Sequence, residues 1–193
     1  MNPLNTIQGT IIAGVVIAVA IALTTMGINP LEQSMIMWLH VGAGVTWIGL
    51  LYYFNFVQVP ALAAAAKDQG GPGGAGISKY VAPRALLWFR WAAVATVLFG
   101  LLLPEIRVSG SVGDLLMLKD GYRTIGIGMW LGIIMALNVW LVIWPNQKRA
   151  LGIVAASDEA KAKSASLAMM ASRTNLILSL PMLYCMIMGA HVG

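Results

Sequence analysis

Five apolar stretches account for most of this 193-residue chain and limit strongly what it can fold into. They cover residues 7–26, 35–57, 85–103, 122–144 and 167–189. A run of about 20 apolar residues can cross the hydrocarbon core of a bilayer as one α-helix. Only 10% of the residues are charged, too few for an ordinary soluble domain. The sequence therefore predicts an all-α integral membrane bundle of five transmembrane helices, forming a single domain over residues 1–193.

The basic residues predict how this bundle is oriented. With five helices, the N-terminus shares its side of the membrane with the segments that follow the second and fourth spans. Cytoplasmic segments of membrane proteins carry the excess of lysine and arginine. We therefore expect a cytoplasmic N-terminus and a periplasmic C-terminus in a bacterial inner membrane. The first span lacks a basic start and a cleavage site, which favours a retained helix over a signal peptide. The basic residues in question are Lys67, Lys79, Arg84, Lys148, Arg149, Lys161, Lys163 and Arg173.

Three connecting segments carry local signals. Residues 61–77 are rich in alanine and glycine, which predicts a flexible loop. Residues 148–163 mix alanine with charge and predict a short surface helix that ends before the fifth span, with a start signal at Ser157 followed by two acidic residues. Residues 104–121 are too polar to insert, so we expect them to cap the outer face.

The only two histidines are predicted to lie at the same membrane face. His40 lies within the first two turns of the second span, and His191 closes the fifth. An imidazole in or beside lipid is costly and is therefore a candidate functional group. Neutral imidazole is a common axial ligand of heme iron. Two histidines that can meet near the periplasmic face therefore predict a b-type heme site with His40 and His191 as iron ligands.

The residues around the histidines suit a flat cofactor. Gly44, Trp47 and Leu51 share one helical face with His40, and the glycine leaves clearance for a porphyrin plane. Arg107 and Arg123 are predicted near the same membrane face, where they could form ion pairs with the heme propionates.

Other interpretations of these residues stay open. His40 could simply hydrogen-bond a neighbouring helix, and His191 could be solvated near the chain end. Methionines near the histidines would suit Cu(I), although copper is the less favoured cofactor because methionine is also an ordinary core residue. The chain has a single cysteine, Cys185, which excludes an internal disulfide and a covalent c-type heme motif. It lies in an apolar run and is expected to be a packed core thiol.

A second polar layer is predicted toward the cytoplasmic side. Arg90 lies one to two turns into the third span, and a buried guanidinium needs partners. We expect a structural cluster that locks the bundle together. Snorkelling of Arg90 to the interface and a substrate site are the alternatives. The amide side chains at a similar depth are Asn55, Gln58, Asn138 and Asn175.

Four blocks of the chain resemble one known family. Residues 38–58, 87–92, 132–147 and 175–191 are similar to the membrane domain of bacterial urate oxidases that are fused to cytochrome c. The resemblance implies a helical membrane scaffold with His40 as a functional residue, in a short stand-alone relative without the cytochrome c domain. The family carries histidines where this chain has Gly126 and Thr174. A weaker likeness links His40 and the Trp-x-Gly that follows it to heme-dependent protoporphyrinogen oxidases and copper-resistance membrane proteins.

Together these features predict an inner-membrane heme b protein that transfers electrons to or from a periplasmic cytochrome c or a partner subunit. The alternative is a cofactor-free accessory subunit of a larger membrane complex. Whether the chain is an enzyme stays open; the compatible chemistry is that of a membrane oxidoreductase. No nucleic-acid motif is present, and the oligomeric state, including a homo-oligomer, stays open.

Overall fold

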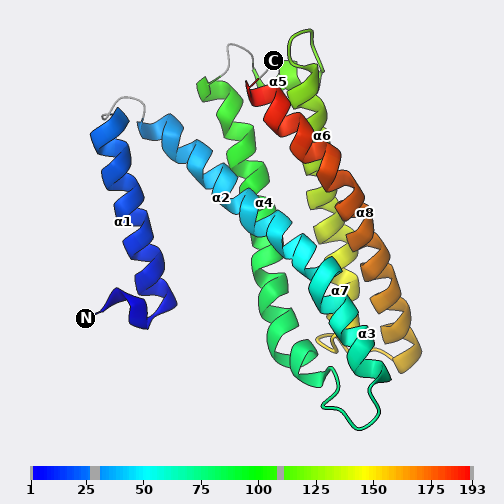
Figure 1. Cartoon of the computed structure of the whole chain (residues 1–193). Helices are drawn as coiled ribbons and strands as arrows, with labels where there is room; N and C mark the ends of the chain where they lie inside the picture. The colour runs from blue at the N-terminus through cyan, green and yellow to red at the C-terminus, as the bar shows by residue number, and fades with distance from the viewer. Residues whose placement is uncertain (1, 27–30, 108–110, 192–193) are drawn as a thin grey trace.

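The computed structural model describes residues 2–26, 31–107 and 111–191, and the regular structure in them is entirely helical. The described residues contain eight α-helices, one short 3-10 segment, η1 (Pro3–Asn5), and three short π-helical segments, η2 to η4. Figure 1 shows how the α-helices are arranged. The α-helices are α1 (Ile7–Met26), α2 (Leu31–Tyr53), α3 (Val59–Lys67), α4 (Ala82–Arg107), α5 (Val112–Leu116), α6 (Arg123–Asn138), α7 (Trp144–Ala150) and α8 (Asp158–His191).

Four helical stretches in the described residues are long and apolar enough to cross a membrane. They are Ile7–Thr25, Ser34–Lys67, Ile77–Glu105 and Arg123–Ala150. This confirms the expectation of a helical chain whose helices are long and apolar enough to span a membrane. The C-terminal helix α8 is not among the four, so the fifth span and the orientation stay predictions.

Two spans continue past the ends that hydropathy predicts, through π-helical turns that lie just before prolines. A π-helical segment, η2 (Phe54–Gln58), continues α2 into α3, and another, η4 (Val139–Ile143), continues α6 into α7. Each ends two residues before a proline, Pro60 and Pro145, and η3 (Ile77–Val81) stands in the same relation to Pro83. A proline inside a helix removes one hydrogen bond and crowds the carbonyl four residues earlier. The wider π-turn accommodates this change, so the helix continues instead of ending.

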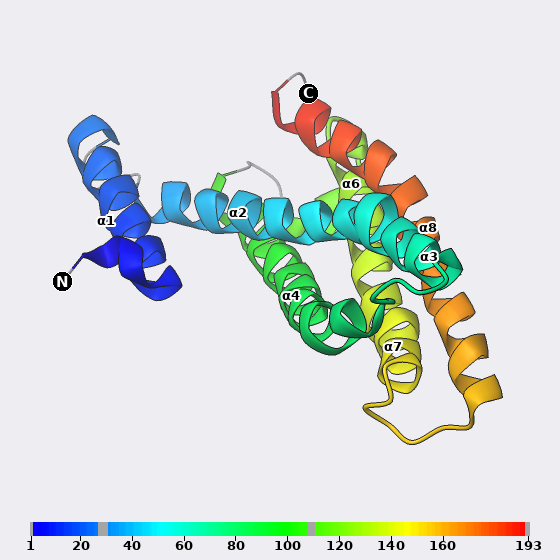
Figure 2. The same ribbon diagram turned by 60° about the horizontal axis from the view of Figure 1, so that its bottom comes forward.

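The bundle consists of two helix pairs. Helix α2 packs most extensively on α4, and α6 packs most extensively on α8. The pairs meet around a buried core that includes Leu51 and Phe89 from the first pair and Met135 from the second, with Phe54 of η2 and Val139 of η4. In Figure 2, α2 and α8 diverge toward the C-terminal end of α8. The most hydrophobic window of α1 is 0% buried, and this helix lies apart from the two pairs (Figure 1).

Two local predictions need correction. Residues 148–163 do not form a separate surface helix, because α8 begins at Asp158 and continues without a break to His191. The start signal itself is right, since the Ser157 hydroxyl accepts a hydrogen bond from the Ala160 amide at 3.2 Å. The predicted loop 61–77 is also shorter than expected, because α3 extends to Lys67 and η3 begins at Ile77.

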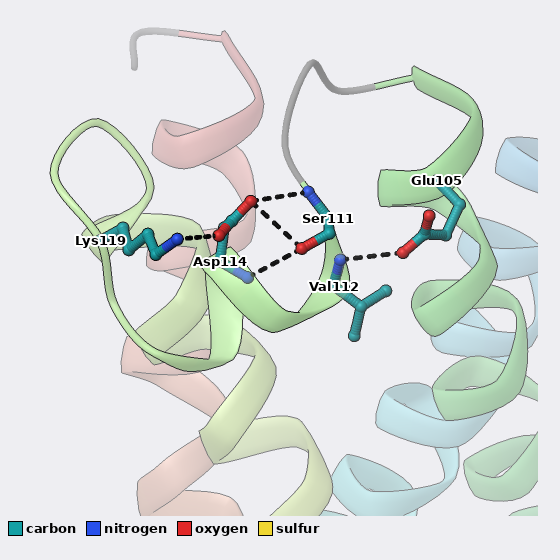
Figure 3. A network of polar contacts seen from close by, with 5 residues as sticks. All are labelled: Glu105, Ser111, Val112, Asp114 and Lys119. Carbon is teal, nitrogen blue, oxygen red and sulfur yellow. Dashed lines mark hydrogen bonds and ion pairs between the residues drawn. The ribbon is translucent and has the colours of Figure 1, made fainter.

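The segment after α4 folds over one end of the bundle. The Ser111 hydroxyl accepts a hydrogen bond from the Asp114 amide at 3.3 Å, and the Asp114 carboxylate accepts one from the Ser111 amide at 3.0 Å (Figure 3). This reciprocal arrangement caps α5. Leu115 is 1% exposed, and α6 approaches its carbonyl so closely that a Cβ on Gly126 would overlap the oxygen. The capped turn therefore docks directly on α6.

Candidate functional site

A cavity of about 710 Å³ lies between the two helix pairs, with walls formed by α2, α4, α6 and α8. Its volume falls within the range of about 300–1,000 Å³ that is typical of cofactor and ligand sites. The lining is mostly apolar, and His40 is the one ionisable imidazole, amine or carboxylate side chain in it among the described residues. A half-buried titratable group on the wall of an apolar cavity marks this region as the candidate site.

The His40 ring is fixed by a backbone contact across the α2–α4 pair. Its Nδ1 lies 2.8 Å from the carbonyl oxygen of Thr96. A carbonyl oxygen can only accept a hydrogen bond, so Nδ1 carries the proton in the neutral ring. The lone pair therefore lies on Nε2, which has no hydrogen-bond partner in the described part of the chain. Histidines that bind metals through Nε2 are commonly held in this way by a carbonyl at Nδ1.

Glycines make room for the ring. A Cβ placed on Gly100 would lie 2.8 Å from Cε1 and 3.0 Å from Nδ1 of His40, closer than real Cβ atoms approach. Gly44, one turn after His40, would place a Cβ at an ordinary 3.7 Å from the Thr96 side chain. The imidazole therefore lies directly against the backbone of α4 at Gly100, while Gly44 supplies clearance on its own helix.

Trp47 is a second notable residue of the cavity lining. The residue is 1% exposed, yet its Nε1–H has no hydrogen-bond partner among the described residues. A buried donor without an acceptor costs about 1–3 kcal/mol. Trp47 therefore lines the cavity with its ring while its N–H stays buried as an unused donor.

The rest of the cavity is lined by flexible apolar side chains and is open on one side. Four methionines line it: Met37, Met129, Met182 and Met186. On the α2 and α8 walls, Val41, Val45 and Ile187 are 51%, 68% and 55% exposed. The cavity therefore borders the outer surface of the bundle where α2 and α8 diverge.

The structure brings some predicted site residues together and leaves others outside the described set. His40, Gly44 and Trp47 all line the cavity, whereas Leu51, predicted on the same face, is buried in the core. His191 ends α8 directly after Ala190, a lining residue, but its side chain lies outside the described residues. The Arg107 side chain also lies outside them.

Arg123 does not face the cavity as a free cation. Its Nη2 lies 2.8 Å from an Asp120 carboxylate oxygen, and both side chains are largely exposed. The lining residue nearest in sequence is Ile125, two positions along α6. Arg123 would have to leave Asp120 to reach a propionate.

The predicted amide residues form interhelical contacts away from the cavity. The Asn138 Nδ2 donates to the Asn175 Oδ1 at 2.8 Å, and the Asn175 Nδ2 donates to the Met135 carbonyl at 3.0 Å. Asn55 donates to the Ser172 hydroxyl at 2.9 Å, which ties η2 to α8. The fourth amide, Gln58, is buried, and its Oε1 has no partner among the described residues.

Arg90 is held differently from these amides. The described residues place its guanidinium carbon 3.7 Å from the centre of the Trp144 ring and show no hydrogen bond from it to an amide side chain. Its backbone carbonyl accepts a hydrogen bond from Trp140 Nε1 at 3.3 Å. The structure therefore joins the asparagines to one another and to backbone, and Arg90 to an aromatic ring.

Sequence reasoning missed the contribution of α4 to the cavity. Thr96 acts through its backbone carbonyl, and Gly100 through the absence of a side chain. Neither leaves a chemical signature in the sequence, although the isolated glycine within a long apolar helix indicates a close approach.

Comparison with known protein families gives a match to part of the chain. The family described as urate oxidase N-terminal matches residues 113–193. This C-terminal part of the chain is similar to the urate oxidase N-terminal family. No curated protein and no solved structure matches the chain. The family match includes two of the four sequence blocks that carry the resemblance, residues 132–147 and 175–191.

The match to the urate oxidase N-terminal family covers α6 to α8 and nearly all of α5. It includes the asparagine pair and the α6–α8 wall of the cavity. It does not include α2, so the position of His40 on the cavity wall rests on the geometry of this chain.

Proposed function

We propose that the cavity binds b-type heme, with His40 as one axial ligand, and that the protein transfers electrons at the membrane. The observation that carries the proposal is the hydrogen bond from His40 Nδ1 to the Thr96 carbonyl, which leaves an unpartnered Nε2 on the wall of an apolar cavity. Bound heme supplies one-electron redox chemistry tuned by its axial ligands and by the polarity around it.

The residues present fit such a group. The apolar lining suits the macrocycle, and the backbone of α4 at Gly100 holds the imidazole in place. Trp47 offers an unpaired donor. We assign the second axial position to His191, which follows the lining residue Ala190. Arg107 lies four residues beyond the lining residue Leu103, one helical turn toward the α4 end, where propionates would need a cation.

The membrane setting belongs to the same proposal. We infer five spans, with α8 as the fifth, a cytoplasmic N-terminus and a periplasmic C-terminus in a bacterial inner membrane. The basic segments after the second and fourth spans support this orientation. The cavity then lies toward the periplasm, where a cytochrome c or a partner subunit could exchange electrons with the heme.

Urate oxidation is not part of the proposal. The related family carries histidines at the positions of Gly126 and Thr174. Gly126 lies against the Leu115 carbonyl, where even a methyl group would overlap, and the Thr174 hydroxyl donates to the Met170 carbonyl of its own helix. These two positions contribute no imidazole here.

The test is an absorption spectrum of the full chain purified after expression with added heme precursor. We expect a Soret band and the sharp reduced α band of a six-coordinate b-type heme. His40→Ala should abolish both. The matched control is Thr46→Ala on the same helix, whose hydroxyl bonds only the Gly42 carbonyl, and it should keep the spectrum. A colourless wild-type protein would reject the proposal.

A cofactor-free accessory subunit remains the second candidate, favoured by α1. This helix is apolar on all sides, and no residue of its most hydrophobic window is buried within the chain. Under this candidate, the purified protein stays colourless and co-purifies with a larger membrane complex, and deletion of α1 releases it.

A further inference from the structure

A second groove, of about 500 Å³, lies where α2 meets η3 and the start of α4. It shares no lining residue with the cavity beside His40. Two of its residues, Leu50 and Tyr53, come from α2. The others are Tyr80, Val81, Arg84, Ala85 and Trp88.

The groove is an apolar surface feature with aromatic edges. Tyr80 and Trp88 are 56% and 60% exposed, and Val81 is 41% exposed. The groove belongs to the stretch Ile77–Glu105, one of those apolar enough to cross a membrane, and lies near its beginning. Tyrosine and tryptophan gather at the level of the lipid headgroups. The groove therefore faces the region where acyl chains begin.

Two cations that form no ion pair among the described residues lie beside it. The Arg84 Nη1 donates to the Tyr80 carbonyl at 2.6 Å, which fixes the side chain but uses only one of the five guanidinium N–H donors. The Lys79 Nζ lies 5.3 Å from the centre of the Tyr80 ring. Neither residue takes part in the three ion pairs found in the described part of the chain.

We propose that this groove binds one anionic phospholipid, with an acyl chain against Leu50, Tyr53 and Ala85 and its phosphate bound by Arg84 and Lys79. Unpaired cations next to an apolar groove at headgroup depth match both parts of such a lipid. Basic pockets between membrane helices on the cytoplasmic side recognise anionic headgroups in this way. A soluble anion would not need the groove. The proposal is independent of the heme site.

The experiment is native mass spectrometry of the full chain in non-ionic detergent, titrated with phosphatidylglycerol, phosphatidylcholine or inorganic phosphate. We expect one phosphatidylglycerol to bind at concentrations at which the other two do not. Replacing Lys79 and Arg84 together with glutamine should weaken binding about tenfold or more, since each basic residue near a headgroup contributes substantially. Arg84→Lys, which keeps the charge, should retain most of the affinity.

Two further variants separate this site from general surface charge. Lys163→Gln with Arg173→Gln removes the same charge from exposed positions and should leave phosphatidylglycerol binding unchanged. Ala85→Phe keeps both cations but fills the groove, and should weaken binding as much as the loss of the cations does. Each variant is first checked for native helicity and monodisperse elution. The proposal is overturned if the charge control weakens binding equally, if Ala85→Phe binds normally, or if inorganic phosphate alone saturates the site.

Discussion

The guanidinium of Arg90 lies over Trp144, with its central carbon 3.7 Å from the centre of the ring. The contact joins α4 to α7. It offsets part of the desolvation free energy of a cation in an apolar span, because the π face of an aromatic ring attracts cations. Trp140 adds a hydrogen bond to the Arg90 carbonyl, so two tryptophans of one helical segment hold this residue.

Arg90→Leu should therefore lower the stability of the bundle without removing heme. We expect a loss of about 0.5–2 kcal/mol, the range for cation–π pairs, seen as a lower melting temperature in detergent. The exposed Arg173→Leu is the matched control and should have little effect. If Arg90→Leu removes the heme spectrum while the melting temperature is unchanged, the heme does not lie beside His40.

Gly100→Ala should disturb the histidine through a single methyl group. The new Cβ would lie 2.8 Å from the His40 Cε1, so the ring must move and the Nδ1 hydrogen bond to Thr96 must weaken. We expect lower heme occupancy or a shifted Soret band in a folded protein. Gly42→Ala is the control, since a Cβ there meets nothing within 4 Å. Equal spectra for the two variants would contradict the placement of the ring.

Asn175→Leu should destabilise the α6–α8 pair. The side chain is 0% exposed and forms two hydrogen bonds to α6, one of them to a backbone carbonyl that would be left without this donor. The expected cost is about 1–3 kcal/mol, measured by thermal or denaturant unfolding. Asn146→Leu removes an amide that bonds only within its own helical segment and should cost less. Equal losses would show that the interhelical bonds contribute nothing.

Asp114 should make the α5 cap sensitive to acid. The Lys119 ammonium, followed by the backbone amide and the hydroxyl of Ser111, lowers the pKa of this carboxyl below its usual range. A group with a lowered pKa in the folded state stabilises the fold above its unfolded pKa, about 3.9, and this contribution is lost as the pH falls through the folded pKa.

Amide hydrogen exchange can measure this effect. In the native protein, the α5 amides should stay protected at neutral pH and lose protection in strong acid. In Asp114→Asn, they should already exchange faster at neutral pH, and the variant should show no further acid step. A native-like acid step in the variant would assign the pH dependence to another group.

The proposed orientation predicts which loops react with impermeant thiol reagents in intact cells. In a Cys185→Ala background, a cysteine in the 70–76 loop should resist labelling, and one at Ser111 should react. Cys185 itself is buried, as the sequence predicts. The opposite labelling pattern would invert the orientation and place the cavity toward the cytoplasm.

Hydropathy predicted the positions of the apolar helices more accurately than it predicted their ends. The span predicted at residues 7–26 matches α1 (Ile7–Met26). The segment after it was predicted to end at 57, yet the helix runs on to Lys67, because a chain that leaves the apolar region need not stop forming helical hydrogen bonds. The same reason explains why α8 begins at Asp158, nine residues before the predicted span.

The contribution of α2, which carries His40, to the candidate site could be predicted from the sequence, whereas the contribution of α4 could not. His40, Gly44 and Trp47 follow from helical spacing and do line one cavity. The Thr96 carbonyl could not be foreseen, since every residue carries one and only the packing of α4 on α2 selects it. The prediction for His191 is untested, because its side chain lies outside the described residues.

The divergence of α2 and α8 has a consequence for assembly. The two helix pairs are joined at one end of the cavity, where the hydroxyl of the lining residue Tyr52 lies 3.2 Å from the Ser179 hydroxyl, and farther along α8, where Asn55 bonds Ser172. At the other end, the wall formed by Val41, Val45 and Ile187 stays exposed on the outer surface. If the cavity binds heme as we propose, this exposed wall gives heme a lateral route from the lipid after the helices have inserted and paired. Loading would then need no unfolding of the bundle, and its rate would follow the concentration of heme dissolved in the bilayer.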